Sequence, residues 1–98
     1  MDLQLKDKVV LITGGAKGIG AAITRGAWCE GAVVIFVDKD AEAGEGLESE
    51  LRKQGARGAF ICADLIPPDN CRATLEQALR EFGRLDALIN NVGVNDGV

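Results

Sequence analysis

The residues that could do chemistry begin with a glycine-rich segment, Thr13-Gly14-Gly15-Ala16-Lys17-Gly18-Ile19-Gly20. It follows an apolar, β-branched run and precedes a segment of helical period, so it leaves a predicted strand and enters a predicted helix. Glycines in this position allow a tight turn, a close approach of the backbone to an anion, and close packing of helix on sheet. The helix N-terminus adds free N–H groups and partial positive charge. The segment therefore predicts a phosphate-binding loop, although a glycine-rich string alone also occurs in simple turns.

An acidic residue follows at the spacing that a dinucleotide site needs. Asp38 ends the second apolar run, 18 positions after Gly20, close to the separation of about 20 at which a carboxylate meets the adenosine ribose. A carboxylate accepts from both ribose hydroxyls but repels a 2′-phosphate, so Asp38 favours NAD over NADP. The alternative is that Asp38 only caps a helix that begins near Asp40.

Two lysines oppose this preference for NAD. Lys17 and Lys39 could each reach a 2′-phosphate and offset its repulsion by Asp38. The alternative for each lysine is a solvated side chain. NADP is therefore the less favoured cofactor but is not excluded by the sequence.

Polar residues also follow the next two predicted strands. Asp64-Leu65 comes after the third apolar run, where a carboxylate can accept from the adenine amino group and a leucine can flank the ring. The alternative is a turn aspartate before Pro67. Asn90-Asn91-Val92-Gly93 closes the fourth strand at the carboxyl edge of the sheet, where ligands bind in open α/β sheets. We expect Asn90 to be structural and Asn91 to contact the cofactor.

The elements that must position these residues follow from the apolar pattern. Runs of strand length alternate with longer segments of helical period, which predicts an α/β fold with the order βαβαβαβ and a parallel sheet. The first two runs are continuous and β-branched, as expected of central strands covered on both faces. We predict strands at 9–13, 33–37, 59–63 and 87–90, and helices from near Gly18, from 40 to 54, and from Pro67-Pro68 to Gly83.

The helical period also predicts which side chains face the sheet. Trp28 lies off the stripe of the first helix and is expected to be partly exposed, without a function. Cys62 is expected in the core, and Gly44 and Gly46 each cost the second helix about 1 kcal/mol relative to alanine. The predicted buried residues are Ile19, Ala22, Ile23, Gly26 and Ala27 in the first helix, Ala43, Leu47 and Leu51 in the second, and Cys71, Leu75, Ala78, Leu79 and Phe82 in the third.

Bulk properties limit the class of protein. The chain has 98 residues, of which 47% are hydrophobic, enough for one modest core, so we expect a single domain over residues 1–98. A net charge of -4 without a basic stripe argues against a nucleic-acid partner, and no apolar stretch is long enough to cross a membrane. Three cysteines without a CxxC pair, and no histidine, do not support a metal site or a disulfide framework. The N-terminus lacks the apolar core of a signal peptide, so we expect a cytoplasmic protein.

Together these residues resemble a known family. Thr13 to Gly20 is similar to the TGxxxGxG motif of the short-chain dehydrogenases/reductases, and Asn90 to Gly93 is similar to their NNAG motif, with Val92 in place of the usual alanine. The resemblance implies the N-terminal half of a Rossmann fold with strand order 3-2-1-4, hydride transfer between NAD and a small alcohol or carbonyl substrate, and a homo-oligomeric parent. The residues that carry over are Gly14, Lys17, Gly18 and Ile19 for the diphosphate, Asp38 for the ribose, Asp64 and Leu65 for the adenine, and Asn91 as a further cofactor contact.

The family's catalytic groups have no counterpart in this chain. Members of the family use a Tyr as general acid/base, a Lys that lowers the pKa of this Tyr, and a Ser that orients the substrate, whereas this chain contains no tyrosine. We expect these groups to lie beyond Val98, so that the chain is an inactive, cofactor-binding fragment of a dehydrogenase. The run from Asn90 to Gly97 resembles that in L-fucose dehydrogenase-like members. The alternative is a non-catalytic dinucleotide sensor or scaffold that has lost the Tyr and the Lys.

The last predicted strand would form an apolar edge of the sheet. Its backbone groups on that side have no partner within the chain, and such an edge promotes pairing with other chains. We therefore expect the isolated chain to be unstable or to associate.

Overall fold

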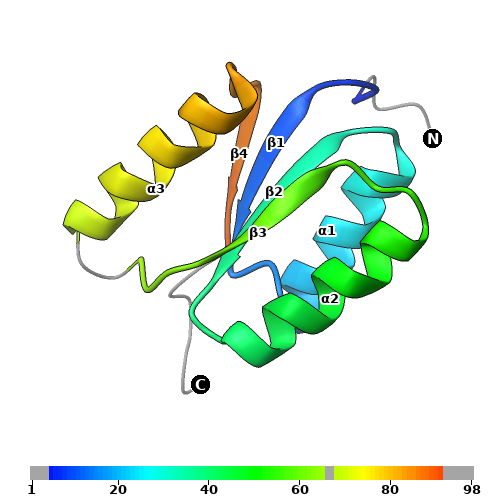
Figure 1. The fold of residues 1–98 in the computed structure, drawn as a ribbon, viewed down its shortest axis with the longest axis horizontal. Helices are drawn as coiled ribbons and strands as arrows, with labels where there is room; N and C mark the ends of the chain where they lie inside the picture. Colours follow the sequence, from blue (N-terminus) through cyan, green and yellow to red (C-terminus); the bar gives the residue numbers. More distant parts are fainter. Residues whose placement is uncertain (1–4, 66–67, 92–98) are drawn as a thin grey trace.

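The chain alternates strands and helices throughout, as the sequence predicts (Figure 1). The computed structural model describes residues 5–65 and 68–91. Each predicted strand is confirmed to within one residue at either end. The elements are β1 (Val9–Thr13), α1 (Gly18–Cys29), β2 (Val33–Asp38), α2 (Ala41–Lys53), β3 (Gly58–Cys62), α3 (Pro68–Phe82) and β4 (Ala87–Asn90).

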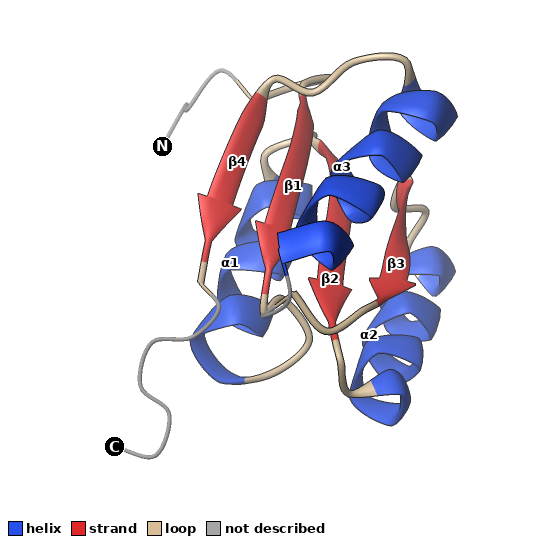
Figure 2. Ribbon diagram, turned by 90° about the vertical axis from the view of Figure 1, so that its left-hand side faces the viewer, coloured by secondary structure: helices blue, strands red, loops and turns tan. Residues whose placement is uncertain are grey.

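All strands are parallel and belong to one sheet in the order β3-β2-β1-β4, which confirms the predicted order 3-2-1-4. The helices α1 and α2 cover one face of this sheet and α3 covers the other, as Figure 2 shows. Every residue of β1 is buried, and so is the centre of β2, because these strands lie between helices on both faces. The continuous apolar runs of the sequence thus correspond to the central strands.

Alternate side chains of the two central strands build two separate cores. Those facing α1 and α2 include Ile12, Val34 and Phe36, with Leu47 and Leu51 of α2 packed against them. Those facing α3 include Leu11, Ile35 and Val37, with Ala78 of α3 packed against them. The two-residue period of a strand therefore divides one apolar run between both faces of the sheet.

Small residues form the buried face of α1, and the predicted stripe is wrong for three of its five members. Ile19 is 74% exposed and Ala22 and Gly26 are also exposed, while Ile23 is half-buried and only Ala27 is buried as predicted. The reason is the close contact at the start of the helix, where a Cβ on Gly20 would lie 1.7 Å from the Gly14 carbonyl oxygen. This contact fixes the rotation of the helix about its axis. The buried residues are Gly20, Ala21, Thr24 and Ala27.

The second helix has the predicted face, with Leu47 and Leu51 buried and Ala43 half-buried. It also buries Gly44, which the sequence analysis treated only as a residue that lowers the stability of the helix. A Cβ on Gly44 would lie 2.0 Å from the Cζ atom of the Phe60 ring, so glycine makes room for this ring under the helix.

Two residues predicted to be buried are exposed, Leu79 in α3 and Cys62 in β3. Leu79 is 47% exposed, and the buried polar residue Thr74 lies on the face that the pattern assigned to apolar side chains. Cys62 is exposed as the last residue of β3, an edge strand of the sheet. Cys71 is only half-buried, and its thiol donates to the Leu65 carbonyl oxygen at 2.9 Å. Trp28 is half-buried against the core under α1, in line with its expected structural role.

Candidate functional site

The predicted site residues meet at the carboxyl ends of the strands. The loop after β1 enters α1, Asp38 ends β2, and Asn91 directly follows β4. Because β1 lies between β2 and β4, the chain leaves β1 in one direction toward β2 and reaches β4 on its other side. In open α/β sheets, a ligand-binding crevice forms at this point, where the connections diverge.

Positive backbone φ angles shape the glycine loop between β1 and α1. Gly14 has φ 63° and Gly18 has φ 54°, a region that side chains rarely allow. No atom lies within 4 Å of the position that a Cβ on Gly18 would take, so the loop is open above the helix start. Lys17 is the N-cap of α1, and no side chain caps the first turn. The N–H groups of this turn and its positive dipole end are thus available to an anion.

The loop is pinned to the start of α1 by Gly20. A Cβ at this position would lie 1.7 Å from the Gly14 carbonyl oxygen and 2.9 Å from the Asn91 Nδ2 atom. Any other residue would push the helix away from the loop. The third glycine of the motif therefore serves close packing, as the sequence predicts.

Thr24 secures the same loop from within α1. Its side chain is completely buried, and its Oγ1 atom lies 3.0 Å from the Gly15 carbonyl oxygen and 2.9 Å from that of Gly20. The hydroxyl carries one proton, which these two carbonyl groups share. Sequence reasoning missed this residue. The available signal was a β-branched hydroxyl in the middle of a helix, four residues after a glycine, where it can bond back to a carbonyl group.

Asp38 organises the backbone around the loop and does not cap α2. Its Oδ2 atom accepts from the Ala16 N–H at 3.2 Å, and its Oδ1 atom accepts from the Asp40 N–H at 3.0 Å. A carboxylate has about four acceptor sites, so about two are left for other donors. The alternative reading of Asp38 as the helix cap is wrong, because Asp40 is the N-cap and accepts from the Ala43 N–H at 3.0 Å.

A salt bridge lies beside Asp38 at the outer side of the loop. The Lys17 Nζ atom is 3.2 Å from the Asp40 Oδ2 atom, and the lysine side chain is 63% exposed. The pKa of Asp40 lies below its ordinary value, first because of the Ala43 N–H and then because of Lys17. Lys39, the other candidate cation, is exposed at the turn between β2 and α2. Of these two lysines, Lys17 is the one paired with a carboxylate.

Asn91 and Thr13 connect the ends of β4 and β1. The Thr13 hydroxyl donates to the Asn90 Oδ1 atom at 2.9 Å and accepts from the Asn91 N–H at 2.8 Å. The Asn91 side-chain amide donates to the Gly14 carbonyl oxygen at 3.3 Å. Asn91 therefore holds the glycine loop in place. The role of Thr13 was also missed, because its partners lie almost 80 positions away.

The structure places Asp64 and Leu65 farther from the glycine loop. They follow β3, which β2 separates from β1. Asp64 is exposed, and Leu65 is half-buried and packs against the core under α3. Beside Leu65 is a cavity of about 270 Å³, which is lined by Leu11, Thr13, Leu65, Cys71, Thr74, Leu75, Leu88 and Asn90.

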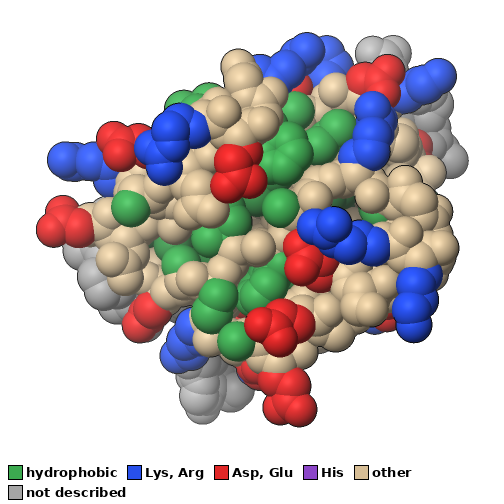
Figure 3. Space-filling model, viewed as in Figure 1, with side chains coloured by type: hydrophobic (Ala, Val, Ile, Leu, Met, Phe, Trp, Pro, Cys, Tyr) green, Lys and Arg blue, Asp and Glu red, His purple; other side chains and the backbone are tan. Residues whose placement is uncertain are grey.

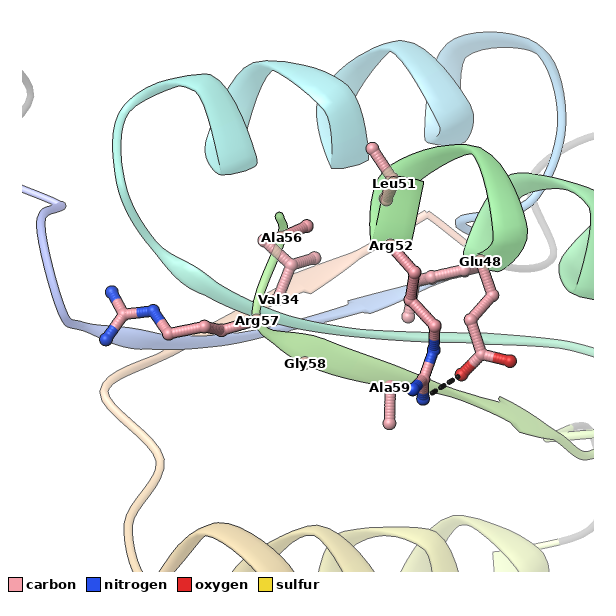
Figure 4. A pocket seen from close by; sticks show the side chains of 9 residues that line it. Val34, Glu48, Leu51, Arg52, Ala56, Arg57, Gly58 and Ala59 are labelled. Atoms are coloured by element: carbon pink, nitrogen blue, oxygen red, sulfur yellow. Dashed lines mark hydrogen bonds and ion pairs between the residues drawn. The ribbon is translucent and has the colours of Figure 1, made fainter. Parts of the chain in front are cut away.

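A second hollow lies at the opposite end of the sheet and has no relation to the loop. It holds about 20 Å³, room for one water molecule. Figure 4 shows its charged wall, where Glu48 and Arg52 of α2 pair at 3.1 Å above the start of β3. On the face that Figure 3 shows, apolar side chains fill the strip between α3 and α2, and acidic and basic side chains are mixed around it. Among the described residues, no group of three or more His, Cys, Asp or Glu could hold a metal ion.

No helix within residues 5–65 and 68–91 has the length and apolar character needed to cross a bilayer. Most of the chain matches the model of a known protein family. Residues 8–98 match the family model described as short chain dehydrogenase.

The curated relatives are dehydrogenases and reductases much longer than this chain. L-fucose dehydrogenase of Oryctolagus cuniculus is 46% identical over 86 residues, which are 88% of this chain and 29% of that protein. D-threitol dehydrogenase of Mycolicibacterium smegmatis is 40% identical over 94 residues, 95% of this chain and 36% of that protein. The chain thus spans about a third of the length of these relatives.

Solved structures agree with the fold. The crystal structure of NAD+-bound xylitol dehydrogenase superimposes with a TM-score of 0.86 at 30% identity, over 92% of this chain and 35% of that one. The Rossmann arrangement predicted from the glycine motif is therefore confirmed, together with the family.

Proposed function

The chain belongs to the short-chain dehydrogenase family, and from this premise we propose that it binds the ADP-ribose part of a nicotinamide dinucleotide, with NAD favoured over NADP. The observation that carries the proposal is the open first turn of α1, which no side chain caps, beside the Asp38 carboxylate. An anion-binding helix start and a ribose acceptor thus lie on neighbouring strands.

The residues fit the groups of the cofactor. The backbone from Gly14 to Gly18 would hold the diphosphate, with Lys17 adding positive charge. Ile19 is 74% exposed at the start of α1, an unusual place for a large apolar side chain, and would cover apolar parts of the dinucleotide. Asp38 would accept from the ribose hydroxyls with the acceptor sites that its two backbone contacts leave.

The remaining cofactor contacts would come from the residues that follow β3 and β4. Asp64 would accept from the adenine amino group, since its carboxylate is exposed after β3, and Leu65 would flank the ring. Asn91 would touch the cofactor from the end of β4. Its amide already bonds the Gly14 carbonyl oxygen, so it would also keep the diphosphate loop in shape.

The parent activity that this site supports is oxidation of an alcohol or reduction of a carbonyl compound. When bound, the nicotinamide accepts or donates a hydride. The relatives named above act, by their names, on L-fucose, D-threitol and xylitol, so a small polyol or sugar is the proposed substrate class. This chain's own residues would bind and orient the cofactor, and no catalytic residue is assigned among them.

Calorimetric titration with NAD and with ADP-ribose tests the proposal. Ile19→Ala should weaken binding of both by about fivefold, the loss of roughly 1 kcal/mol of apolar contact. Leu79→Ala is the matched control, because this side chain is 47% exposed on α3, away from the loop. Circular dichroism checks that each variant is folded. A folded wild-type chain that binds neither ligand at millimolar concentration would refute the proposed function.

A further inference from the structure

We propose that Asp40 sets cofactor specificity by holding the Lys17 ammonium away from the position of a 2′-phosphate. The inference rests on the proposed function, because it assumes that Asp38 receives the adenosine ribose. It goes further by assigning part of the preference for NAD to Asp40, a residue outside both the glycine motif and the ribose carboxylate, through its salt bridge with Lys17.

Backbone hydrogen bonds tie Asp38 to the neighbour of Lys17 and to Asp40, and Lys17 and Asp40 form a salt bridge. The Asp38 carboxylate accepts from the N–H of Ala16, the neighbour of Lys17, and from the N–H of Asp40. The Lys17 Nζ atom lies 3.2 Å from the Asp40 Oδ2 atom. A ribose held by Asp38 would therefore lie next to the Lys17–Asp40 salt bridge. A phosphate on its 2′-oxygen would enter the space that the salt bridge borders.

The charges of Asp38, Lys17 and Asp40 determine whether a 2′-phosphate would be attracted or repelled. Without Asp40, Lys17 would be free to pair with the phosphate and offset the repulsion by Asp38. With Asp40, the ammonium already has a partner and a second carboxylate faces the phosphate. Asp40 is ionised at neutral pH, as an ordinary aspartate is, and the Ala43 N–H and Lys17 lower its pKa further. The pair thus turns a lysine that would favour NADP into one that does not.

Asp40→Asn separates this effect from the role of Asp40 in the fold. Asparagine is as good an N-cap as aspartate, so the bond from the Ala43 N–H is kept while the charge is lost. Lys17 is then released. Because the lysine is 63% exposed, the gain is that of an exposed ion pair, up to about fivefold in affinity.

The experiment titrates the whole chain with NAD and NADP, and with 5′-AMP and adenosine 2′,5′-bisphosphate as probes of the ribose alone. Asp40→Asn should raise the affinity for NADP relative to NAD, and for the bisphosphate relative to 5′-AMP, by up to about fivefold. The gain should shrink as salt rises from 0.01 to 1 M. Adding Lys17→Gln to Asp40→Asn should abolish the gain, whereas adding Lys39→Gln should preserve it.

The outcomes separate the two proposals. If the wild-type chain binds NAD but Asp40→Asn leaves the ratio of NADP to NAD affinity unchanged, the inference fails and the proposed function stands. If the gain survives Lys17→Gln or disappears with Lys39→Gln, the salt bridge is not its source and the inference also fails. If no folded variant binds any of the four ligands, the proposed function itself fails.

Discussion

At the scale of single residues, two glycines of α2 have opposite surroundings. A Cβ on Gly44 would lie 2.0 Å from the Phe60 ring, whereas a Cβ on Gly46 would meet no atom within 4 Å. The Phe60 ring is itself stacked on Phe36, with centroids 5.3 Å apart, so the neighbour of Gly44 is held in place. One glycine makes space in the core, and the other only weakens the helix.

This difference predicts stability changes of opposite sign. Gly44→Ala should lower the free energy of unfolding by about 1–3 kcal/mol, because overpacking displaces the stacked ring. Gly46→Ala should raise it by up to about 1 kcal/mol, the difference in helix propensity. Urea denaturation of the two variants measures both values. Stabilisation by Gly44→Ala would show that the Phe60 ring does not pack under the helix at this point.

The sequence predicted the site residues but not the bonds that hold them. The glycine positions and Asp38 follow from a motif and a spacing, because each meets a local backbone need. Thr13 and Asn91 contact each other between the neighbouring strands β1 and β4, and the hydroxyl of Thr24 donates to carbonyl groups whose position depends on how α1 packs. Such contacts arise from tertiary packing, and local sequence carries little information about it. The same limit applies to the Lys17–Asp40 salt bridge.

At the scale of elements, strands were easier to predict than helix faces. A central strand is apolar on both faces. A continuous apolar run such as Val9–Thr13 therefore identifies it, and it is not necessary to know which residues face which side. A helix face depends on rotation about the helix axis. In α1 the contact of Gly20 with the loop sets this rotation and leaves Ile19 exposed, against the apolar period.

The two edge strands differ in how their outer backbone groups are treated. On β3, the Phe60 N–H donates to the Glu48 Oε2 atom at 3.0 Å, and α2 shields this edge. On β4, Leu88 is 51% exposed, and the strand pairs only with β1 among the described residues. An exposed apolar edge invites pairing with another chain.

The β4 edge predicts that the 98-residue chain associates as its concentration rises. Leu88→Lys should reduce this association severalfold, because a charged edge residue opposes strand pairing. Leu79→Lys, an equally exposed apolar position on α3, should change it much less. Sedimentation velocity over a range of concentrations measures the effect. A wild-type chain that stays monomeric and unfolds in a sharp, concentration-independent transition would contradict the prediction.

At the scale of the whole molecule, ion pairs link segments that are distant in sequence. Arg57 before β3 pairs with Asp7 before β1, and Arg25 of α1 pairs with Glu50 of α2. At the amino end of β4, the Asp86 carboxylate accepts hydrogen bonds from the Arg84 side chain and from the Val9 N–H. These carboxylates sit at the junctions between elements. Their protonation should therefore affect the whole fold.

These pairs predict a stability that falls in acid. The pKa values of Asp7, Glu50 and Asp86 are lowered, in each case first by a hydrogen bond from an arginine. A group whose pKa is lower in the folded chain than in the unfolded chain stabilises the fold at any pH above its unfolded pKa, here 3.8 for Asp and 4.5 for Glu. That contribution is lost as pH falls through the folded pKa. Melting temperatures measured between about pH 7 and pH 2 should be level above about pH 5 and then decline.

Salt gives the control for this prediction. Asp7 is exposed, and Glu50 and Asp86 are partly exposed, so salt at about 1 M should lessen the decline by screening the pairs. A melting temperature that rises below about pH 4 would reverse the sign and contradict the pairing.

The contact of Asn91 with the glycine loop also sets an order of events during synthesis. A ribosome releases a chain from its N-terminus at about 5–20 residues per second, so β1 and the loop exist for seconds before β4 emerges. Until then, β1 lacks one neighbouring strand, and the Gly14 carbonyl lacks its amide donor. The glycine loop between β1 and α1 should thus become rigid in one late step, when β4 pairs with β1. A translational pause before codon 87 would prolong the period in which β1 is open to nascent chains on neighbouring ribosomes.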